Sequence, residues 1–167
     1  MRFLSGLAAI AVLGLGISPA AADEGKETKL KLSEVPKKVL RAVKKKFPGA
    51  KLLGAEKEIE NKKTIYEINL KYKGHKYDVT FTPGGKLIEI EKTIAVKDLP
   101  EAVTEALNKK YPKATFKKAE EVTKGKKVVF EVVLVTQDKK SFEVVVSPEG
   151  KILEEESKDK KKEKDDD

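Results

Sequence analysis

The stretch VPKKVLRAVKKKFPGAKLLGAEKEIENKKTIYEINLKYKGHKYDVTFTPGGKLIEIE, residues 35–91, has a second copy in this chain. That copy is LPEAVTEALNKKYPKATFKKAEEVTKGKKVVFEVVLVTQDKKSFEVVVSPEGKILEEE, residues 99–156. Matching positions lie 64 residues apart until Gln137-Asp138 and 65 apart afterwards, so one residue was gained at a surface turn. A repeat of this length predicts one structural unit built twice.

Each copy begins with a pattern typical of a helix. Val35, Val39, Val43 and Phe47 form an apolar stripe at helical spacing, and the second copy repeats the stripe with equivalent residues. Prolines follow both stripes, at Pro48 and Pro112, and end both predicted helices.

Side chains that can accept a hydrogen bond from the first turn precede both predicted helices. These are Ser33 in the first copy and Asp98 in the second, and we expect them to be the N-cap residues.

The rest of each copy alternates apolar and polar residues, which is typical of strands with one buried face. Residues 66–72 and 77–81 form a predicted hairpin, flanked by strands at 51–59 and 87–93, and residues 115–122 and 152–155 are the equivalent flanking strands. The predicted class is α+β, with two tandem α-β-β-β-β units. About eight strands form one antiparallel meander sheet, and two helices cover one face of it. Nothing in the sequence covers the opposite face.

The two ends of the chain differ from the repeats. Residues 1–22 have a positive start, an apolar run and an Ala-x-Ala site, and so predict a signal peptide cleaved after Ala22. An uncleaved membrane anchor is the alternative. We expect a linker at 23–32, repeat 1 at 33–93, repeat 2 at 94–156 and a disordered charged tail at 157–167. The predicted location is therefore periplasmic or secreted, with no stable membrane span after cleavage.

The charge and the cysteine count limit the function. The 167 residues carry a net charge of +8, of which the predicted signal peptide holds one, and there is no cysteine to form a disulfide. Basic character favours anionic partners. Nucleic acid is not expected, because the chain is predicted to be exported and its basic stretch has no interleaved aromatic residues.

Residues for catalysis are scarce. The single histidine, His75, lies at a predicted turn, and no cysteine or second histidine supplies a nucleophile or a metal ligand. Glu67 and Glu131 occupy equivalent strand positions on the open face, where we expect them to be solvated partners of nearby lysines. The sequence therefore predicts no enzyme, no cofactor and no metal site.

Two features are candidate partner-binding sites. The second copy has valines on its open face where the first copy has polar residues, and an exposed apolar patch is typical of an interface. Its members are Val129, Val133, Val135 and Val145. The first helix has a basic face formed by Lys37, Lys38, Arg41, Lys44 and Lys45. For the valines, the alternative is the ordinary preference of β-branched residues for strands. For the basic face, the alternative is an ordinary solvated helix surface. Formation of a homodimer through the valines or through an edge strand also stays open.

The order of motifs is similar to that of a known family. A helix opened by Val-Pro or Leu-Pro and closed by [FY]-P-x-A, then Ala-Glu, an aromatic-Glu strand and a P-x-G-K turn, resembles the PepSY-like modules of the beta-lactamase-inhibitor-like group, here in tandem. The resemblance implies a secreted or periplasmic, non-enzymatic module whose relatives bind proteins and in some cases inhibit hydrolases. No inhibitory residue is carried over, since this chain has neither Cys nor Trp.

These observations predict an exported, non-catalytic binding module for an unidentified extracytoplasmic protein or polymer partner. Two alternatives remain open. One is an inhibitor of an extracytoplasmic hydrolase that acts through the lysine-rich turns at 61–63 and 124–127, and the other is an electrostatic binder of anionic envelope polymer.

Overall fold

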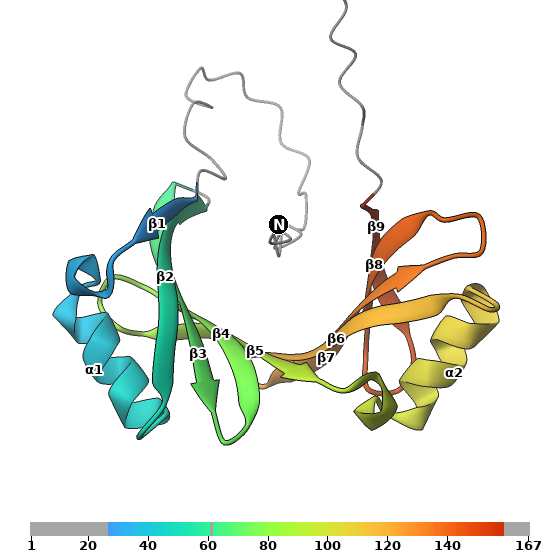
Figure 1. The fold of residues 1–167 in the computed structure, drawn as a ribbon, viewed down its shortest axis with the longest axis horizontal. Helices are drawn as coiled ribbons and strands as arrows, with labels where there is room; N and C mark the ends of the chain where they lie inside the picture. The colour runs from blue at the N-terminus through green and yellow to red at the C-terminus, as the bar shows by residue number, and fades with distance from the viewer. Residues whose placement is uncertain (1–26, 61, 159–167) are drawn as a thin grey trace, which may run out of the picture.

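The computed structural model describes residues 27–60 and 62–158 of the chain. They form one antiparallel meander of nine strands, in which spatial order follows chain order, together with two ten-residue helices (Figure 1). The strands are β1 (Thr28–Leu30), β2 (Lys51–Glu60), β3 (Lys63–Tyr72), β4 (His75–Phe81), β5 (Leu87–Ile94), β6 (Thr115–Lys124), β7 (Lys127–Val135), β8 (Ser141–Val146) and β9 (Ile152–Ser157). The helices are α1 (Lys37–Lys46) and α2 (Glu101–Lys110).

This architecture confirms the predicted class. The ninth strand is β1, which lies within the segment expected to be a linker and pairs with residues 55–57 of β2. The predicted signal peptide and all but the first two residues of the predicted tail lie outside the described residues. Among the described residues, no helix is long and apolar enough to cross a membrane.

The expected N-cap residues were wrong. Pro36 and Pro100 are the N-cap residues of α1 and α2. Ser33 and Asp98 instead lie in single 3-10 turns, Leu32–Glu34 and Val96–Asp98, because one extended residue and the proline separate each turn from its helix. The carbonyl of each proline accepts the first hydrogen bond of the helix, from Leu40 N at 3.1 Å in α1. Both helices end before the predicted proline stops.

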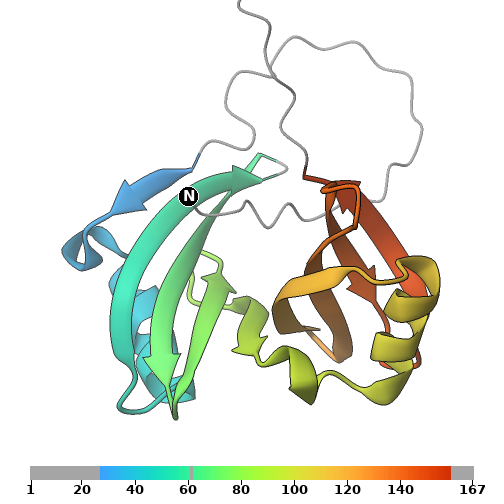
Figure 2. The ribbon, with the colours of Figure 1, turned by 45° about the vertical axis from the view of Figure 1, so that its right-hand side comes forward.

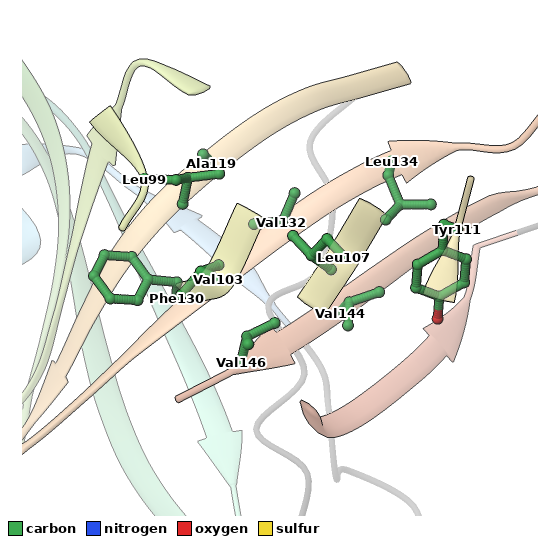
Figure 3. Close-up of a cluster of buried hydrophobic side chains, with 10 residues drawn as sticks. All are labelled: Leu99, Val103, Leu107, Tyr111, Ala119, Phe130, Val132, Leu134, Val144 and Val146. Carbon is green, nitrogen blue, oxygen red and sulfur yellow. The ribbon is translucent and has the colours of Figure 1, made fainter. Parts of the chain in front are cut away.

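Each helix covers its own repeat on the outer side of the curved sheet, and the two helices lie at opposite ends (Figure 1). Beneath α1, the side chains of Val39 and Val43 are buried against strands β2 to β4. Beneath α2, the equivalent contacts form a second cluster with β6 to β8 (Figure 3). That second cluster consists of Leu99, Val103, Leu107, Tyr111, Ala119, Phe130, Val132, Leu134, Val144 and Val146.

The P-x-G-K turns fix the start of each helix to the sheet. Gly85 and Gly150 have φ of +82° and +84°, and an added Cβ would lie 2.7 Å from Lys38 O and 2.5 Å from Ala102 O, respectively. Glycine is therefore required twice over at these turns, for the backbone conformation and for the close approach of the helix backbone.

The opposite face of the sheet, here called the open face, carries no helix. Figure 2 shows both helices on the outer side of the bent sheet, which leaves the inner side of the strands uncovered by any described element. This arrangement places the open-face side chains of both repeats along one continuous surface that crosses the junction between β5 and β6.

Candidate functional site

Carboxylates gather at the middle of the open face. The strand register brings Asp78 opposite Glu91, and Glu120 opposite both Thr93 and Glu131. We call the set of six acidic residues there the carboxyl cluster. Its members are Glu67, Asp78, Glu89, Glu91, Glu120 and Glu131, contributed by five adjacent strands from β3 to β7.

The centre of the carboxyl cluster is tightly packed. One carboxylate oxygen from each of Asp78, Glu91 and Glu120 lies within 4.8 Å of the others. Glu91 and Glu120 are only 5% and 4% exposed, although no described element covers the face. The bend of the sheet and the neighbouring side chains thus shield these acids from water.

Neutral donors hold the first-repeat side of the cluster. The amide nitrogen Nδ2 of Asn69 donates to Asp78 Oδ1 at 2.6 Å and to Glu67 Oε1 at 2.7 Å. The carbonyl oxygen of the same side chain faces Gly54, where an added Cβ would lie 3.0 Å away. The missing side chain at Gly54 therefore makes room for the Asn69 amide.

Two lysines of the second repeat form ion pairs with members of the cluster. Lys118 Nζ lies 2.7 Å from Glu120 Oε2, and Lys124 Nζ lies 3.2 Å from Glu89 Oε2. Burial lowers the pKa of Lys118, but the hydrogen bond to Glu120 and the negative charges of Glu120, Glu91 and Asp78 together outweigh burial, and the net effect raises the pKa. These two ion pairs balance part of the negative charge of the cluster.

The pKa values of two cluster members show the effect of burial and like charge. Burial, followed by repulsion from Glu120, raises the pKa of Glu91 to about 9. Burial and repulsion from Glu143 raise the pKa of Glu131 to about 7. Burial and like charge therefore both favour the protonated form of Glu91, and a cation brought close to it would favour ionisation.

Asp78, Glu91 and Glu120 are the residues that could hold a metal ion within the described part of the chain. Three carboxylate oxygens suit a hard cation such as Ca²⁺, which usually takes six to eight oxygen ligands. The sequence predicted no metal site, and that prediction stays untested.

The predicted valine site lies on the open face beside the carboxyl cluster. Val129, Val133, Val135 and Val145 are each partly buried on strands β7 and β8. Glu131 is opposite Val145, and Glu143 is opposite Val133, so apolar and acidic side chains alternate. The valines therefore form an apolar border to the carboxyl cluster, and do not form a purely apolar patch.

The predicted basic site lies on the other side of the sheet. Lys37, Lys38, Arg41, Lys44 and Lys45 are all exposed on α1. The structure thus separates the two groups of predicted binding residues, with the valines on the open face and the basic side chains on the outer helix.

The two glutamates expected to be solvated partners of lysines, Glu67 and Glu131, both lie in partly buried positions. Glu67 accepts a hydrogen bond from Asn69, and burial, followed by repulsion from Glu143, raises the pKa of Glu131 although nearby Lys118 lowers it. Sequence reasoning also missed Glu89, Glu91 and Glu120, because each strand was read alone. The sequence did contain a signal for these acids, in the Ala-Glu motif at 119–120 and in the alternation at Glu89 and Glu91. Only the strand register shows that these glutamates lie close together.

The structure defines a class: two tandem α+β units that share one sheet, with one face under helices and one face open. The family described as "Putative beta-lactamase-inhibitor-like, PepSY-like" matches the sequence twice, at residues 22–89 and 72–154. The chain therefore belongs to this family, as the order of motifs indicated.

Solved structures share this fold. A "putative periplasmic" protein of Bacteroides eggerthii is 17% identical with a TM-score of 0.65, covering 74% of this chain and 88% of that one. A DUF2874 family protein of Bacteroides uniformis is also 17% identical, with a TM-score of 0.64 and coverage of 73% and 88%. A BLIP-like protein of Bacteroides fragilis is 19% identical, with a TM-score of 0.59 and coverage of 71% and 83%. None of the curated proteins matches the sequence.

Proposed function

We propose that this chain is an exported, non-catalytic binding module whose open face binds a cationic segment of a partner protein. The observation that carries the proposal is the carboxyl cluster, in which one carboxylate oxygen from each of three acids, two of them buried, lies within 4.8 Å of the others. A lysine or arginine from a partner would relieve this repulsion and let Glu91 ionise.

The valines supply the second part of the binding face. Half-buried Val129 and Val145 border the cluster and have apolar surface that a partner side chain can cover. An interface with an apolar contribution beside charge-assisted hydrogen bonds is typical of specific protein binding. The same face would thus select partners by shape as well as by charge.

Export supports a partner outside the cytoplasm. The sequence predicts a signal peptide ending at Ala22, and the Bacteroides eggerthii neighbour is described as periplasmic. The absence of catalysis is part of the proposal. His75 Nδ1 lies 3.4 Å from the backbone carbonyl of Thr93, and the sequence has no cysteine to act with it as a nucleophile.

A narrower candidate is an inhibitor of an extracytoplasmic hydrolase. It is favoured by the fold shared with the protein of Bacteroides fragilis that is described as BLIP-like. In this case the partner is an enzyme, and the lysine-rich turns beside the open face would enter its active site. Substitution of Lys126 and Lys127 would then abolish inhibition while partner capture by the open face persists.

The decisive experiment uses residues 23–167 as immobilised bait for the extracytoplasmic fraction of the host. One variant, Val133→Lys with Val145→Lys, places charge on the valine border. A second, Glu120→Gln with Glu131→Gln, removes two acids of the carboxyl cluster. The matched control, Lys44→Gln with Lys45→Gln, changes two exposed residues of α1 on the outer side.

The expected result is a protein retained by the wild type and the α1 control and lost by both open-face variants. Retention at low and at physiological salt is expected, because the valine contacts do not depend on ionic strength. Loss only in the α1 control would contradict the proposal and favour the anionic-polymer alternative. Equal retention by every variant would reject the open face as the binding site.

A further inference from the structure

Positive charge is concentrated on the outer helix of the first repeat. All five members of the basic face are exposed, and α1 contains no acidic residue that could pair with them along the helix. The second helix differs, because α2 contains Glu101 and Glu105. Its Lys110 also forms an ion pair with Glu155 of the same chain. Charge is therefore balanced on α2 and strongly basic on α1.

Acidic side chains continue from the carboxyl cluster to the edge of the open face. The register places Glu120 opposite Glu131 on β7. Two residues further along β7, Val133 is opposite Glu143, which is itself opposite Glu156 of β9. The acids thus form a diagonal row, here called the acidic track, with one member on each strand from β4 to β9. Its members are Asp78, Glu91, Glu120, Glu131, Glu143 and Glu156.

The spacing of the acidic track matches the turns of a helix. Glu91 and Glu120 are related by a diagonal step of the same kind. Neighbouring strands lie about 4.8 Å apart and two residues advance about 6.6 Å along a strand, so successive acids are on average about 5.5 Å apart along the track. Lys37, Arg41 and Lys45 are each four residues apart on α1, which corresponds to about 6 Å along a helix. Basic side chains on successive turns can therefore meet successive acids.

Two lysines of the chain show that the acidic track accepts ammonium groups. Lys118 Nζ lies 2.7 Å from Glu120 Oε2. Lys158 Nζ lies 2.7 Å from Glu156 Oε2 and 3.3 Å from Glu143 Oε2. A carboxylate has two oxygens and about four acceptor positions, so each of these acids can accept a further donor beside its own lysine.

A helix is the element that suits the inner side of the bent sheet. The outer side is covered by helices (Figure 2), which is the usual way to cover a sheet face. A helix pairs its own backbone groups, whereas an extended segment that crosses above the side chains does not. Val133 and Val145 flank the acids on β7 and β8, and the apolar stems of lysine and arginine can cover these valines while their charged groups reach the track.

We propose that the open face binds the basic face of α1 from a second copy of this chain. The inference rests on the proposed function and names the cationic segment that the open face takes. Because α1 lies on the outer side of the sheet and the acidic track on the inner side, these surfaces of one copy point in opposite directions (Figure 1). The contact is therefore head to tail, and further copies add to it without closing into a symmetric pair. The net charge of +8 opposes contact at long range, so assembly requires a high protein concentration.

Variants that each lose one of the two surfaces test this contact. All are made in the protein of residues 23–167. The helix variant, Lys37→Glu with Arg41→Glu, reverses charge on the basic face and leaves the open face intact. The face variant, Glu131→Gln with Glu143→Gln, removes two acids of the track and leaves α1 intact.

Sedimentation velocity is measured for each protein alone and for an equimolar mixture of the two variants. The wild type should form species larger than a dimer as its concentration rises, and each variant alone should associate at least about ten-fold more weakly. The mixture should form a dimer and nothing larger, since α1 of the face variant still fits the open face of the helix variant. The control, Lys97→Glu with Lys109→Glu, makes the same charge change at exposed positions of the second repeat and should associate like the wild type.

A wild type that stays monomeric would overturn the inference, and so would a mixture that associates no better than its components. A wild type that stops at a dimer would overturn it as well, because a symmetric pair uses the same surface twice. Circular dichroism confirms that each variant is folded, so failure of the mixture is failure of the contact.

Failure of this inference and failure of the proposed function give different results. If the wild type is monomeric and the open-face variants still lose a protein that the bait captures, self-contact is rejected and the proposed function stands. If copies assemble as expected and the bait retains no protein, the second copy is the occupant of the open face and the external partner is rejected.

Discussion

The two repeats are nearly alike beneath their helices and unlike on the open face. On the helix side, Leu70 and Leu134 occupy equivalent positions, and both are fully buried. On the open face, Gly54 corresponds to Lys118, and Asn69 corresponds to Val133. The fold therefore depends on the buried residues on the helix side, which the two repeats share. The residues on the open face differ between the two repeats.

That difference explains where the candidate site lies. The carboxyl cluster takes four acids from strands β3 to β5 of the first repeat and two from β6 and β7 of the second. Each repeat stabilises its share in its own way, by the Asn69 amide in the first and by the Lys118 ammonium in the second. One repeat alone would lack part of the cluster, so the site requires the tandem arrangement.

The largest expected effect tests whether the hydrophobic clusters beneath α1 and α2 contribute equally to the free energy of unfolding. Leu70→Ala and Leu134→Ala each remove a fully buried side chain and leave a cavity, so each should lower the free energy of unfolding by about 3 kcal/mol. Urea unfolding followed by circular dichroism measures the loss. Leu53→Ala and Leu153→Ala, at positions about half exposed, are the controls and should change it by less than about 0.5 kcal/mol. A large loss in one repeat only would contradict the equivalence of the cores.

A smaller effect is expected at the P-x-G-K turns. Gly85→Ala and Gly150→Ala should each cost about 2 kcal/mol, because the new Cβ meets helix backbone and the residue has a positive φ. Gly74→Ala is the matched control, since Gly74 has φ of +86° but no atom within 4 Å of an added Cβ. It should cost about 1 kcal/mol from conformation alone. Thermal unfolding of the three variants separates the contact between the new Cβ and the helix backbone from the cost of the positive φ. Equal losses of stability in all three would show that this contact contributes nothing.

Much of this fold could be predicted from the sequence, because the repeat, the apolar stripes and the proline stops are local signals. The α+β meander and the helix-covered face follow from them. The candidate site could not be found in the same way. Asp78, Glu91 and Glu120 are far apart in the sequence and meet only through the register of three strands. The short strand β1 was missed because three residues give too little alternation to predict a strand.

The third prediction concerns pH and compares Glu91 with its repeat equivalent, Glu156. Because the folded pKa of Glu91 is about 9 and its ordinary value is 4.5, the folded state binds more protons between these values. The free energy of unfolding should therefore fall as pH rises through this window, by up to about 1.4 kcal/mol per pH unit for a full proton. Glu91→Gln removes this contribution, so the variant should gain stability over the wild type from pH 5 to pH 9.

Urea unfolding at pH 5, 7 and 9 provides the measurement. Glu156→Gln is the control, since the Glu156 side chain is 64% exposed at the sheet edge, and its curve should run parallel to that of the wild type. If Glu91→Gln ran parallel as well, Glu91 would not be held protonated by its neighbours.

The smallest expected effect concerns the lysine that distinguishes the second repeat. Lys118→Met leaves Glu120 without its ammonium partner. This should lower the free energy of unfolding by about 1 kcal/mol at pH 8. A larger loss is not expected, because the Lys118 side chain is 39% exposed and water screens the ion pair. At pH 5 the loss should shrink, because the raised pKa of Glu131, about 7, leaves less negative charge around Lys118 at that pH. Lys117→Met, at an exposed neighbouring position, is the control and should have little effect at either pH. A loss that is the same at both pH values would mean that the Lys118 side chain contributes through packing. In that case the Lys118–Glu120 ion pair would not be what stabilises the second-repeat side of the cluster.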